Sequence, residues 1–284
     1  MCFEDGMRRA DVCMWVRNGA ETLPLVLERI DEVIPHEVIG QKILVDDRST
    51  DDSVEIAKEF NWDVYENREG GIGCGANTAL SKVRTDLFIS VEQDVLLNRD
   101  WYDRISRHMA RDNVAVAQGW RLSTNPTIRA FETFGVEHLG ADRLYSIDNN
   151  VYDTKVIRAL GGFPTMVRYH VDAVLRSRVR DAGYAWLTDM SVVSTHIRRI
   201  NAFRWAWERN YRIATEYPML IRDRLLSPDE AIKLDPVFQL VKTVLSLPIG
   251  GYMAMKTGCP QLALFYPVVR LAKLVGHIKG LVEG

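Results

Sequence analysis

Two acidic segments, each directly after a strand-like run, could bind a nucleotide and a metal. Asp46-Asp47 follows the apolar run 43–45 and precedes Ser, Thr and Asp residues of the kind that cap helices. Glu92-Gln93-Asp94 follows the apolar run 87–91. Carboxylates at the carboxyl edge of a parallel sheet lie where open α/β folds bind ligands, and an acid-x-acid triplet suits a divalent cation. The two segments together suggest a site for a metal-bound sugar nucleotide.

Alternating strand-like and helix-like segments must position these acids. Apolar runs predict strands over residues 12–16, 43–45, 62–65, 87–91, 114–120, 185–187 and 192–195. Helical periodicity with cap residues predicts helices over residues 23–30, 53–60, 75–83, 154–160, 171–182 and 201–217. The order predicts an α/β fold of Rossmann-like type, with a mostly parallel central sheet flanked by helices and a C-terminal helical extension.

Composition bounds the class of protein. The chain has 284 residues, 47% of them hydrophobic, and a net charge of −2, so it can bury a full core and has no overall basic character that would favour nucleic acid as a partner. The N-terminus carries acids where a signal peptide carries basic residues, so we expect a cytoplasmic catalytic domain. Scattered thiols with no metal-binding spacing are expected to be structural: Cys2, Cys13, Cys74 and Cys259.

A set of motifs in a fixed order resembles the inverting family-two glycosyltransferases, which have a GT-A fold. In chain order the motifs are Arg17-Asn18-Gly19-Ala20-Glu21, Val45-Asp46-Asp47-Arg48-Ser49-Thr50-Asp51, Gly71-Ile72-Gly73-Cys74-Gly75-Ala76-Asn77, Glu92-Gln93-Asp94, Gly161-Gly162-Phe163, Asp172 with Leu175 and Arg178, and Thr195-His196. The resemblance implies a GT-A catalytic domain over residues 1–200, with a nucleotide-sugar half (11–120) and an acceptor half (121–200). Residues 201–284 would form a helical, apolar and basic C-terminal region.

The resemblance implies a metal-dependent enzyme that moves a sugar, with inversion, from a nucleoside diphosphate sugar of the UDP or GDP type to an acceptor hydroxyl. Asp94 corresponds to the family's metal-binding acid, and His196 resembles the histidine that completes the metal site. The cofactor would be Mn²⁺ or Mg²⁺, and an imidazole ligand favours Mn²⁺. Asp172 is the predicted catalytic base, because inversion by direct displacement requires a group that takes the proton from the acceptor hydroxyl.

Other residues are expected to hold the nucleotide and the acceptor. Ala76 stands where relatives often carry an arginine, so Arg68 is expected to contact the diphosphate instead. Glu92 replaces the first acid of the usual Asp-x-Asp and would contact ribose or a metal-bound water. The predicted nucleotide-binding residues are Arg17, Asn18, Glu21, Asp46, Asp47, Arg68, Asn77 and Glu92. The predicted acceptor-binding residues are His170 and Trp120. The alternative is that the acids only cap helices and Arg17 and Asn18 only shape a turn.

The late motif bears on the acceptor. Polyprenyl-phosphate sugar transferases of this family usually carry a basic residue and a Gly-x-Ser segment there, whereas this chain has Ser194-Thr195-His196-Ile197-Arg198. A phosphate acceptor is already ionised and needs little general base, so the motif favours a hydroxyl, on a lipid-linked or membrane-proximal saccharide. The alternatives are a polyprenyl (dolichyl) phosphate glycosyltransferase and, in another class, a non-catalytic sugar-nucleotide-binding or membrane assembly protein.

The tail is apolar and basic. From Val237 onward it holds five Lys or Arg residues and one acid, Glu283. Its first apolar stretch, 237–255, is interrupted by Lys242, Pro248 and Gly250-Gly251, so a clean spanning helix is not expected. Such a segment predicts helices that lie on anionic lipid, which would make the protein peripheral on the inner face of the cell membrane. The alternatives are packing on the catalytic domain and a homodimer interface.

Overall fold

The computed structural model describes residues 8–139 and 145–283. The strands in this part of the chain are β1 (Ala10–Val16), β2 (Ile39–Asp46), β3 (Asp63–Glu66), β4 (Leu87–Ser90), β5 (Val95–Leu96), β6 (Val114–Ser123), β7 (Asn150–Asp153) and β8 (Ala185–His196). The helices up to residue 181 are α1 (Leu23–Val33), α2 (Ser53–Glu59), α3 (Ile72–Lys82), α4 (Trp101–Ser106), the 3-10 turn η1 (Arg107–Ala110), α5 (Pro126–Leu139), α6 (Thr154–Ala159) and α7 (Val171–Asp181). The later helices are α8 (Ala202–Thr215), α9 (Tyr217–Arg222), α10 (Pro228–Ala231), the 3-10 turn η3 (Ile232–Leu234), α11 (Pro236–Val244), α12 (Ser246–Thr257) and α13 (Leu262–Glu283).

The strands of the described residues form one eight-stranded sheet in the order β3-β2-β1-β4-β7-β6-β8-β5. β1 pairs in parallel with both β2 and β4, and β2 pairs in parallel with β3. β7 pairs antiparallel with β4 and β6, and β5 pairs antiparallel with β8. The predicted α/β fold with flanking helices and a helical C-terminal region is therefore confirmed. The two extended segments predicted over 185–195 are parts of a single strand, β8.

The strand order brings three functional loops to one edge of the sheet. β1 lies between β2 and β4, and all three strands run in the same direction. Val16 at the end of β1 is level with Asp46 at the end of β2, and Cys13 is level with Ser90 at the end of β4. The loops that follow β1, β2 and β4 consequently begin at the same edge, which is where parallel α/β sheets bind ligands.

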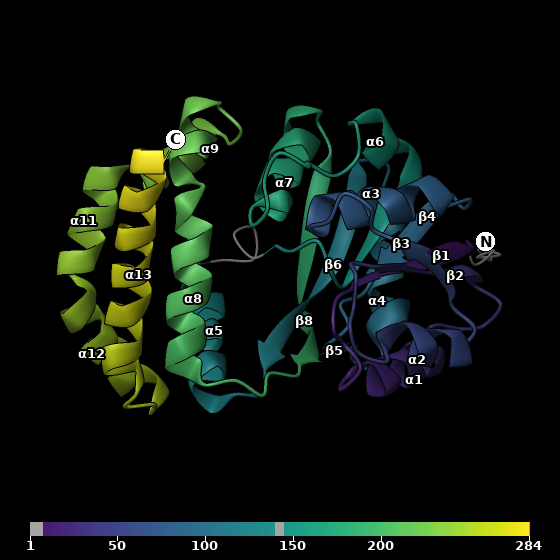
Figure 1. The fold of residues 1–284 in the computed structure, drawn as a ribbon, viewed down its shortest axis with the longest axis horizontal. Helices are drawn as coiled ribbons and strands as arrows, with labels where there is room; N and C mark the ends of the chain where they lie inside the picture. Colours follow the sequence, from purple (N-terminus) through teal and green to yellow (C-terminus); the bar gives the residue numbers. More distant parts are fainter. Residues whose placement is uncertain (1–7, 140–144, 284) are drawn as a thin grey trace, which may run out of the picture. The chain divides into compact units, whose positions relative to one another are not determined.

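Helices cover both faces of the parallel half of the sheet (Figure 1), with α1, α2 and α4 on one side and α3 and α6 on the other. Alternate residues of β1 pack against the apolar stripe of α1, whose helical spacing explains why α1 forms and which face it buries. The buried stripe consists of Leu23, Val26, Leu27 and Ile30. This core fixes the strand ends on which the site is built.

Contacts divide the chain into two compact units. The first, here the catalytic unit, comprises Met1–Arg121, Ala141–Val171 and Arg178–Ile197. The second, here the helical unit, comprises Leu122–Gly140, Asp172–Ser177 and Arg198–Gly284.

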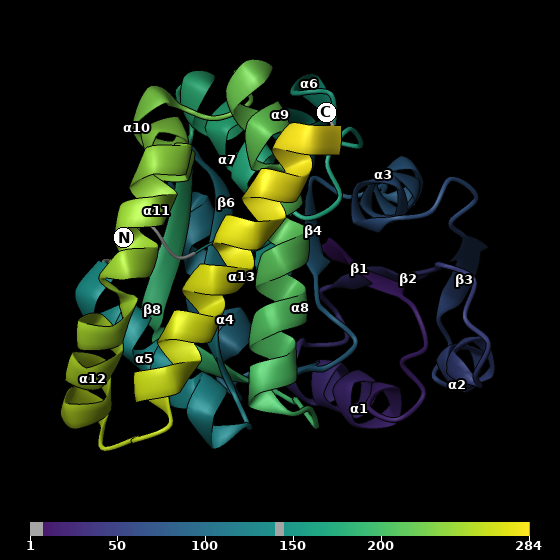
Figure 2. The same cartoon turned by 60° about the vertical axis from the view of Figure 1, so that its left-hand side comes forward.

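In the helical unit, α13 packs along α8 and also contacts α11 and α12 (Figures 1 and 2). Two glycines of α13 make the approach to α8 possible, because a Cβ at Gly276 or Gly280 would collide with the carbonyl oxygen of Tyr211 or Thr215. An aromatic and aliphatic core that includes Leu262, Phe265 and Val269 fills the space between these helices and α5.

The apolar tail is helical, but it bends. Among the described residues no single helix is both long and apolar enough to cross a membrane, and α11 with α12 reaches that length and composition only as a pair bent by 58°. The break lies at Leu245, between the two helices. Gly250 and Gly251 lie inside α12 and do not break the helix, and Gly250 allows close contact with the carbonyl oxygens of Leu262 and Ala263.

Candidate functional site

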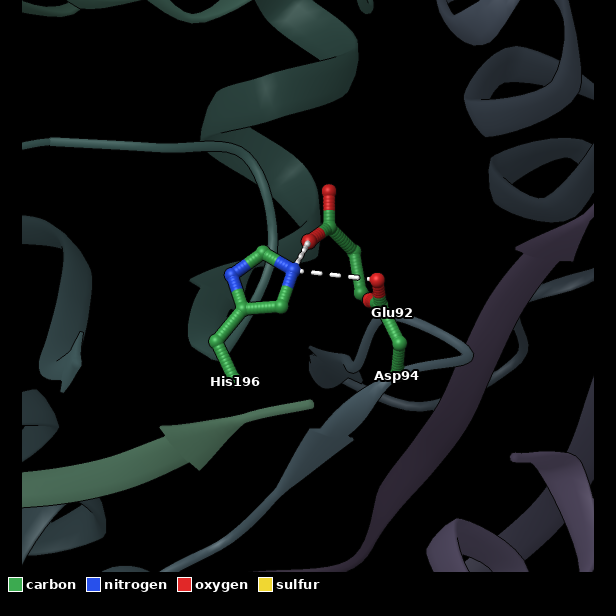
Figure 3. Close-up of side chains that lie close together, drawn as sticks. All are labelled: Glu92, Asp94 and His196. Atoms are coloured by element: carbon green, nitrogen blue, oxygen red, sulfur yellow. Dashed lines mark hydrogen bonds and ion pairs between the residues drawn. The ribbon is translucent and has the colours of Figure 1, made fainter. Parts of the chain in front are cut away.

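Glu92, Asp94 and His196 converge in the catalytic unit (Figure 3). The two acids lie in the loop after β4, and His196 is the last residue of β8. The short antiparallel pair of β5 with β8 sets Val95 opposite His196, which brings the histidine beside the acidic triplet. His196 Nε2 lies 3.0 Å from Asp94 Oδ2 and 3.9 Å from Glu92 Oε2. One ligand atom from each residue lies within 4.8 Å of the others, a spacing that one metal ion could bridge.

The donor set fits a divalent metal. Two carboxylate oxygens and one imidazole nitrogen suit Mn²⁺, and also Mg²⁺ with added water ligands. Glu92 was predicted to contact the nucleotide, and its position makes it a candidate metal ligand as well. The ion would replace the hydrogen bond that now joins the histidine to Asp94.

Arg121 at the base of this cluster was missed by the sequence analysis. Its Nε lies 3.2 Å from His196 Nδ1 and 3.2 Å from Asp148 Oδ2, and its Nη1 donates to Ser146 Oγ at 2.9 Å. Asp148 is almost fully buried, with 2% of its side chain exposed, so the guanidinium is its counter-charge. Arg121 therefore holds the back of the imidazole ring, on the side opposite Asp94.

Carboxylates surround the cluster. Glu92 and Asp94 belong to it, and the buried Asp148 lies 3.2 Å from Arg121, which is itself 3.9 Å from Glu92. A site lined by carboxylates suits a cation.

Gln93, between the two acids, links the loop that carries Glu92 and Asp94 to the loop after β1. Its side-chain oxygen accepts from the backbone N–H of Arg17 at 2.9 Å, and its side-chain nitrogen donates to the Arg17 carbonyl at 3.2 Å. Thr22 Oγ donates to the Gln93 carbonyl at 2.9 Å. The contact needs a glycine at position 19, because a Cβ there would lie 2.9 Å from the Gln93 side chain.

The predicted nucleotide residues of the β1 and β2 loops lie together. Asp46 accepts from the backbone N–H of Ser49 at 3.1 Å, and Asn18 accepts from that of Thr50 at 2.8 Å, so both shape the acidic turn. Asp47 lies 4.0 Å from Arg17 and accepts from the N–H of Gly71 at 3.3 Å.

The acidic turn is also anchored by Asp51. Burial raises the pKa of Asp51, but hydrogen bonds from Ser53 and Ala20 outweigh it and hold that pKa below its usual range, so the turn is anchored by a carboxylate. Glu21, the remaining predicted residue of the β1 loop, is exposed.

A pocket of about 590 Å³ lies between the end of β3 and α3. Arg68 and Asn77, both predicted to bind nucleotide, are among its lining residues. Arg68 is highly exposed and lies 3.9 Å from Glu66. Asn77 also has a structural task, since its amide donates to the carbonyl of Phe163 and accepts from the N–H of the same residue, each at 2.8 Å. This pair of bonds holds the Gly161-Gly162-Phe163 turn, where both glycines have positive φ, against α3.

The predicted base and acceptor residues lie on other elements. Asp172 stands in the first turn of α7, where its carboxylate accepts from the N–H of Ala173 at 2.7 Å. His170 occupies the N-cap position of the same helix without a side-chain cap bond. Trp120, in β6, has its ring 5.8 Å from the Arg121 guanidinium, and its indole nitrogen is buried. Asp172 belongs to the helical unit, whereas the metal cluster belongs to the catalytic unit.

Comparison with known proteins shows which family the chain matches. The model of glycosyl transferase family 2 matches residues 11–175. No match was found among curated protein sequences.

Several solved structures share the fold. The chain is similar to the mannosyltransferase PcManGT from Pyrobaculum calidifontis, solved with GDP-Man and Mn²⁺, with a TM-score of 0.72, 18% identity and coverage of 98% of this chain and 88% of that one. For S. aureus TarS 1-349 with UDP-GlcNAc the TM-score is 0.55, with 13% identity and coverage of 93% and 90%. For glucosyl-3-phosphoglycerate synthase from Mycobacterium tuberculosis with Mn²⁺, UDP and glucosyl-3-phosphoglycerate, the TM-score is 0.56, with 14% identity and coverage of 78% and 82%. At these identities the similarity is one of fold.

Proposed function

This chain belongs to glycosyl transferase family 2, whose model matches more than half of its length. From that premise we propose that it transfers a sugar from a nucleoside diphosphate sugar to an acceptor hydroxyl. The transfer would proceed with inversion and with Mn²⁺ or Mg²⁺ as cofactor. The observation that supports this most is the convergence of Glu92, Asp94 and His196 at the edge of the sheet where β1, β2 and β4 end. Similar folds have been solved with GDP-Man and Mn²⁺ and with UDP-GlcNAc, which supports a nucleotide sugar as donor.

The site residues of the catalytic unit have separate tasks in this proposal. Glu92, Asp94 and His196 hold the metal, which when bound neutralises the charge that develops on the leaving nucleoside diphosphate. Arg121 lies on the far side of the histidine ring and is the counter-charge of the buried Asp148. Metal binding through Nε2 would move the imidazole proton to Nδ1 and so break the present Arg121–Nδ1 hydrogen bond. The loops after β1 and β2 bind the base and ribose through Asp46 and Asp47, whose carboxylates accept hydrogen bonds.

Asp172 acts on the acceptor in this proposal. It removes the proton from the attacking hydroxyl as the new glycosidic bond forms, on the face opposite the leaving group. A hydroxyl needs this base, whereas a phosphate acceptor would not. The acceptor is therefore a hydroxyl, and membrane attachment through the tail would place that hydroxyl on a lipid-linked or membrane-proximal saccharide.

Donor binding is tested by thermal unfolding with UDP, GDP and dTDP, each with and without Mn²⁺. We expect one diphosphate to raise the Tm by about 2–4 °C at about ten times its Kd, and to do so only with metal, because the ion bridges the diphosphate to the acidic cluster. The matching nucleoside is the control, since it has no diphosphate for the ion to bridge and should show no Mn²⁺ dependence. Equal Tm shifts with and without metal would contradict the proposal.

The helical unit attaches the protein to an anionic lipid surface in this proposal. Exposed apolar residues lie at helical spacing along one stripe of α11 (Val237, Leu240, Val241 and Val244) and along one stripe of α13 (Leu264, Leu271, Val275, Ile278 and Val282). Apolar stripes beside an excess of basic residues are typical of helices that lie in a membrane interface. Such attachment would place the enzyme at the inner face of the cell membrane, where anionic lipids attract basic segments.

Vesicle binding is tested with Val237→Glu/Val244→Glu in the full chain, because deleting the tail would uncover the core between α8 and α13. The double variant should bind at least about tenfold more weakly to vesicles of 70% phosphatidylcholine and 30% phosphatidylglycerol. Each substitution removes apolar area that the membrane would bury and adds a negative charge that anionic lipid repels. Leu25→Glu, at a comparably exposed leucine of α1, is the control and should bind as the unmodified chain does. If the double variant still sediments with vesicles, and if the unmodified chain is a dimer that the substitutions dissociate, the apolar stripe of α11 is a homodimer interface instead.

A further inference from the structure

Three basic side chains of α11 and α13, Lys242, Arg270 and Lys273, act on one another electrostatically, and His277 lies one turn beyond Lys273 on α13. The four residues are here named the basic cluster. The last three are spaced i, i+3, i+7 and so share one face of α13. Two contacts bind this face to α11. Arg270 Nη2 donates to Gln239 Oε1 at 2.6 Å, and Thr243 Oγ1 donates to the Arg270 carbonyl at 3.3 Å.

Within the described part of the chain, no ion pair joins Lys242, Arg270 or Lys273 to an acid. Five acids of the surrounding helices pair with other cations, in the pairs Arg204–Glu208, Arg222–Asp223, Lys233–Asp229, Arg176–Glu230 and Lys279–Glu283. Asp235, whose charge acts on His277, already accepts from two backbone N–H groups at the start of α11. Among the described residues, Lys242 and Lys273 form no ion pair, and the ammonium of Lys242 lies 4.2 Å from the centre of the Phe238 ring.

Several polar atoms of the cluster are buried without a partner. Arg270 is 6% exposed and His277 is 1% exposed. Within the described part of the chain, Arg270 Nε and both ring nitrogens of His277 make no hydrogen bond. The ring of Tyr217 meets the His277 ring edge-on at 5.6 Å and closes one side. Unsatisfied buried polar atoms are rare in folded proteins and call for a ligand or water to satisfy them.

The uncompensated charge has a cost. Burial, together with the charges of Arg270, Arg209 and Lys242, lowers the pKa of Lys273 to about 7. Burial and the charge of Arg270 likewise lower the pKa of Lys242 to about 8. Burying like charges without a counter-ion destabilises a fold, so a bound anion would remove a penalty already built into these helices.

We propose that the basic cluster is a binding site for a phosphate ester. A guanidinium, two ammonium groups and an imidazole supply donors from several directions, which suits a doubly charged group with several acceptor oxygens better than a flat carboxylate. Lys242 and Lys273 are partly exposed, so the anion can enter from outside. None of these four residues belongs to the group of Glu92, Asp94 and His196 or to the residues predicted to bind nucleotide and acceptor. The phosphate comes either from the headgroup of a phospholipid or from a soluble phosphate or diphosphate.

The test compares the unmodified chain with Lys273→Met and Lys242→Met in an uncharged detergent. Without phosphate, Lys273→Met should raise the Tm, because it removes a partly buried positive charge that is repelled by Arg270 and Lys242. Inorganic phosphate or pyrophosphate at about ten times its Kd should raise the Tm of the unmodified chain by about 2–4 °C, and that rise should disappear in both variants. Lys279→Met is the matched control, since Lys279 lies on α13 but is exposed and paired with Glu283.

A second arm identifies the source of the phosphate. The same proteins are mixed with vesicles of phosphatidylcholine alone or with 30% phosphatidylglycerol. A Tm rise with soluble phosphate assigns the site to soluble phosphate esters, and a rise that needs phosphatidylglycerol and is lost in the variants assigns it to a lipid headgroup. Either result supports the site. The proposal is overturned if neither probe raises the Tm. It is also overturned if Lys279→Met loses the Tm rise as fully as Lys242→Met does. Because this second comparison does not use Lys273→Met, the test stays decisive if that variant fails to fold.

Discussion

Replacing Asp94 by asparagine is expected to lower sugar transfer by about 10²–10³-fold, because the metal that stabilises the leaving diphosphate would lose a charged ligand. Asparagine keeps the size of the side chain and one oxygen, so the hydrogen bond to His196 Nε2 and the fold should remain. The affinity for Mn²⁺, measured by calorimetry without any donor, should weaken by at least about tenfold. The rate is measured as nucleoside diphosphate released from the donor that binds best.

The control is Asp112→Asn, which changes an exposed acid that precedes β6. It should leave both Mn²⁺ affinity and rate unchanged. Full metal affinity in Asp94→Asn would show that the cluster of Glu92, Asp94 and His196 does not bind the catalytic ion. Lower activity with normal metal binding would move the role of Asp94 from the ion to the sugar donor.

Replacing Asp172 by asparagine should lower transfer to the acceptor by about 10²–10⁴-fold, the usual contribution of a general base. Binding of Mn²⁺ and of the nucleoside diphosphate should stay within about twofold, because the base acts only on the acceptor. Azide offers a direct check, since it is already ionised. It would attack the anomeric carbon as the diphosphate leaves, and should restore donor cleavage in Asp172→Asn but not in Asp94→Asn.

The competing explanation for Asp172 is that it only stabilises the start of α7, where a negative charge interacts well with the helix dipole. Asp103→Asn tests that explanation, because Asp103 is an acid in the first turn of α4. If both variants lose stability alike and neither loses turnover selectively, Asp172 is structural. A selective loss of turnover at Asp172 with azide rescue identifies the base.

Much of the fold could be predicted because its signals are local. Apolar runs that end in Asp46 or before Glu92 mark buried parallel strands, and the helical spacing of Leu23 to Ile30 marks the helix between them. Each of these patterns lies within a dozen residues, so neighbours in sequence determine it. The Gly161-Gly162 turn is local as well, because positive φ values at two successive positions favour glycine.

The surroundings of the metal cluster could not be predicted in the same way. Arg121 approaches His196 and Asp148 only because β6, β7 and β8 become neighbours in the sheet, and no local pattern indicates that order. The pairing of β5 with β8 depends on a two-residue strand, too short to have a periodicity. A buried acid such as Asp148 resembles any other loop acid until its arginine is found.

The tail shows a further limit of sequence patterns. Gly250-Gly251 has the composition of a helix break, yet both residues are helical because Gly250 lets α12 pack closely against the start of α13. Tertiary contact thus overrides the helix propensity of glycine. The bend forms at Leu245 instead, where α11 ends.

The clamp that Gln93 makes on Arg17 has a thermodynamic consequence. Because the same amide joins the loop after β1 to the acids after β4, we expect a ligand that orders either loop to order the other as well. By linkage, the factor by which the cation raises the affinity for the nucleotide would equal the factor by which the nucleotide raises the affinity for the cation. Loss of either ligand after turnover would then promote release of the other.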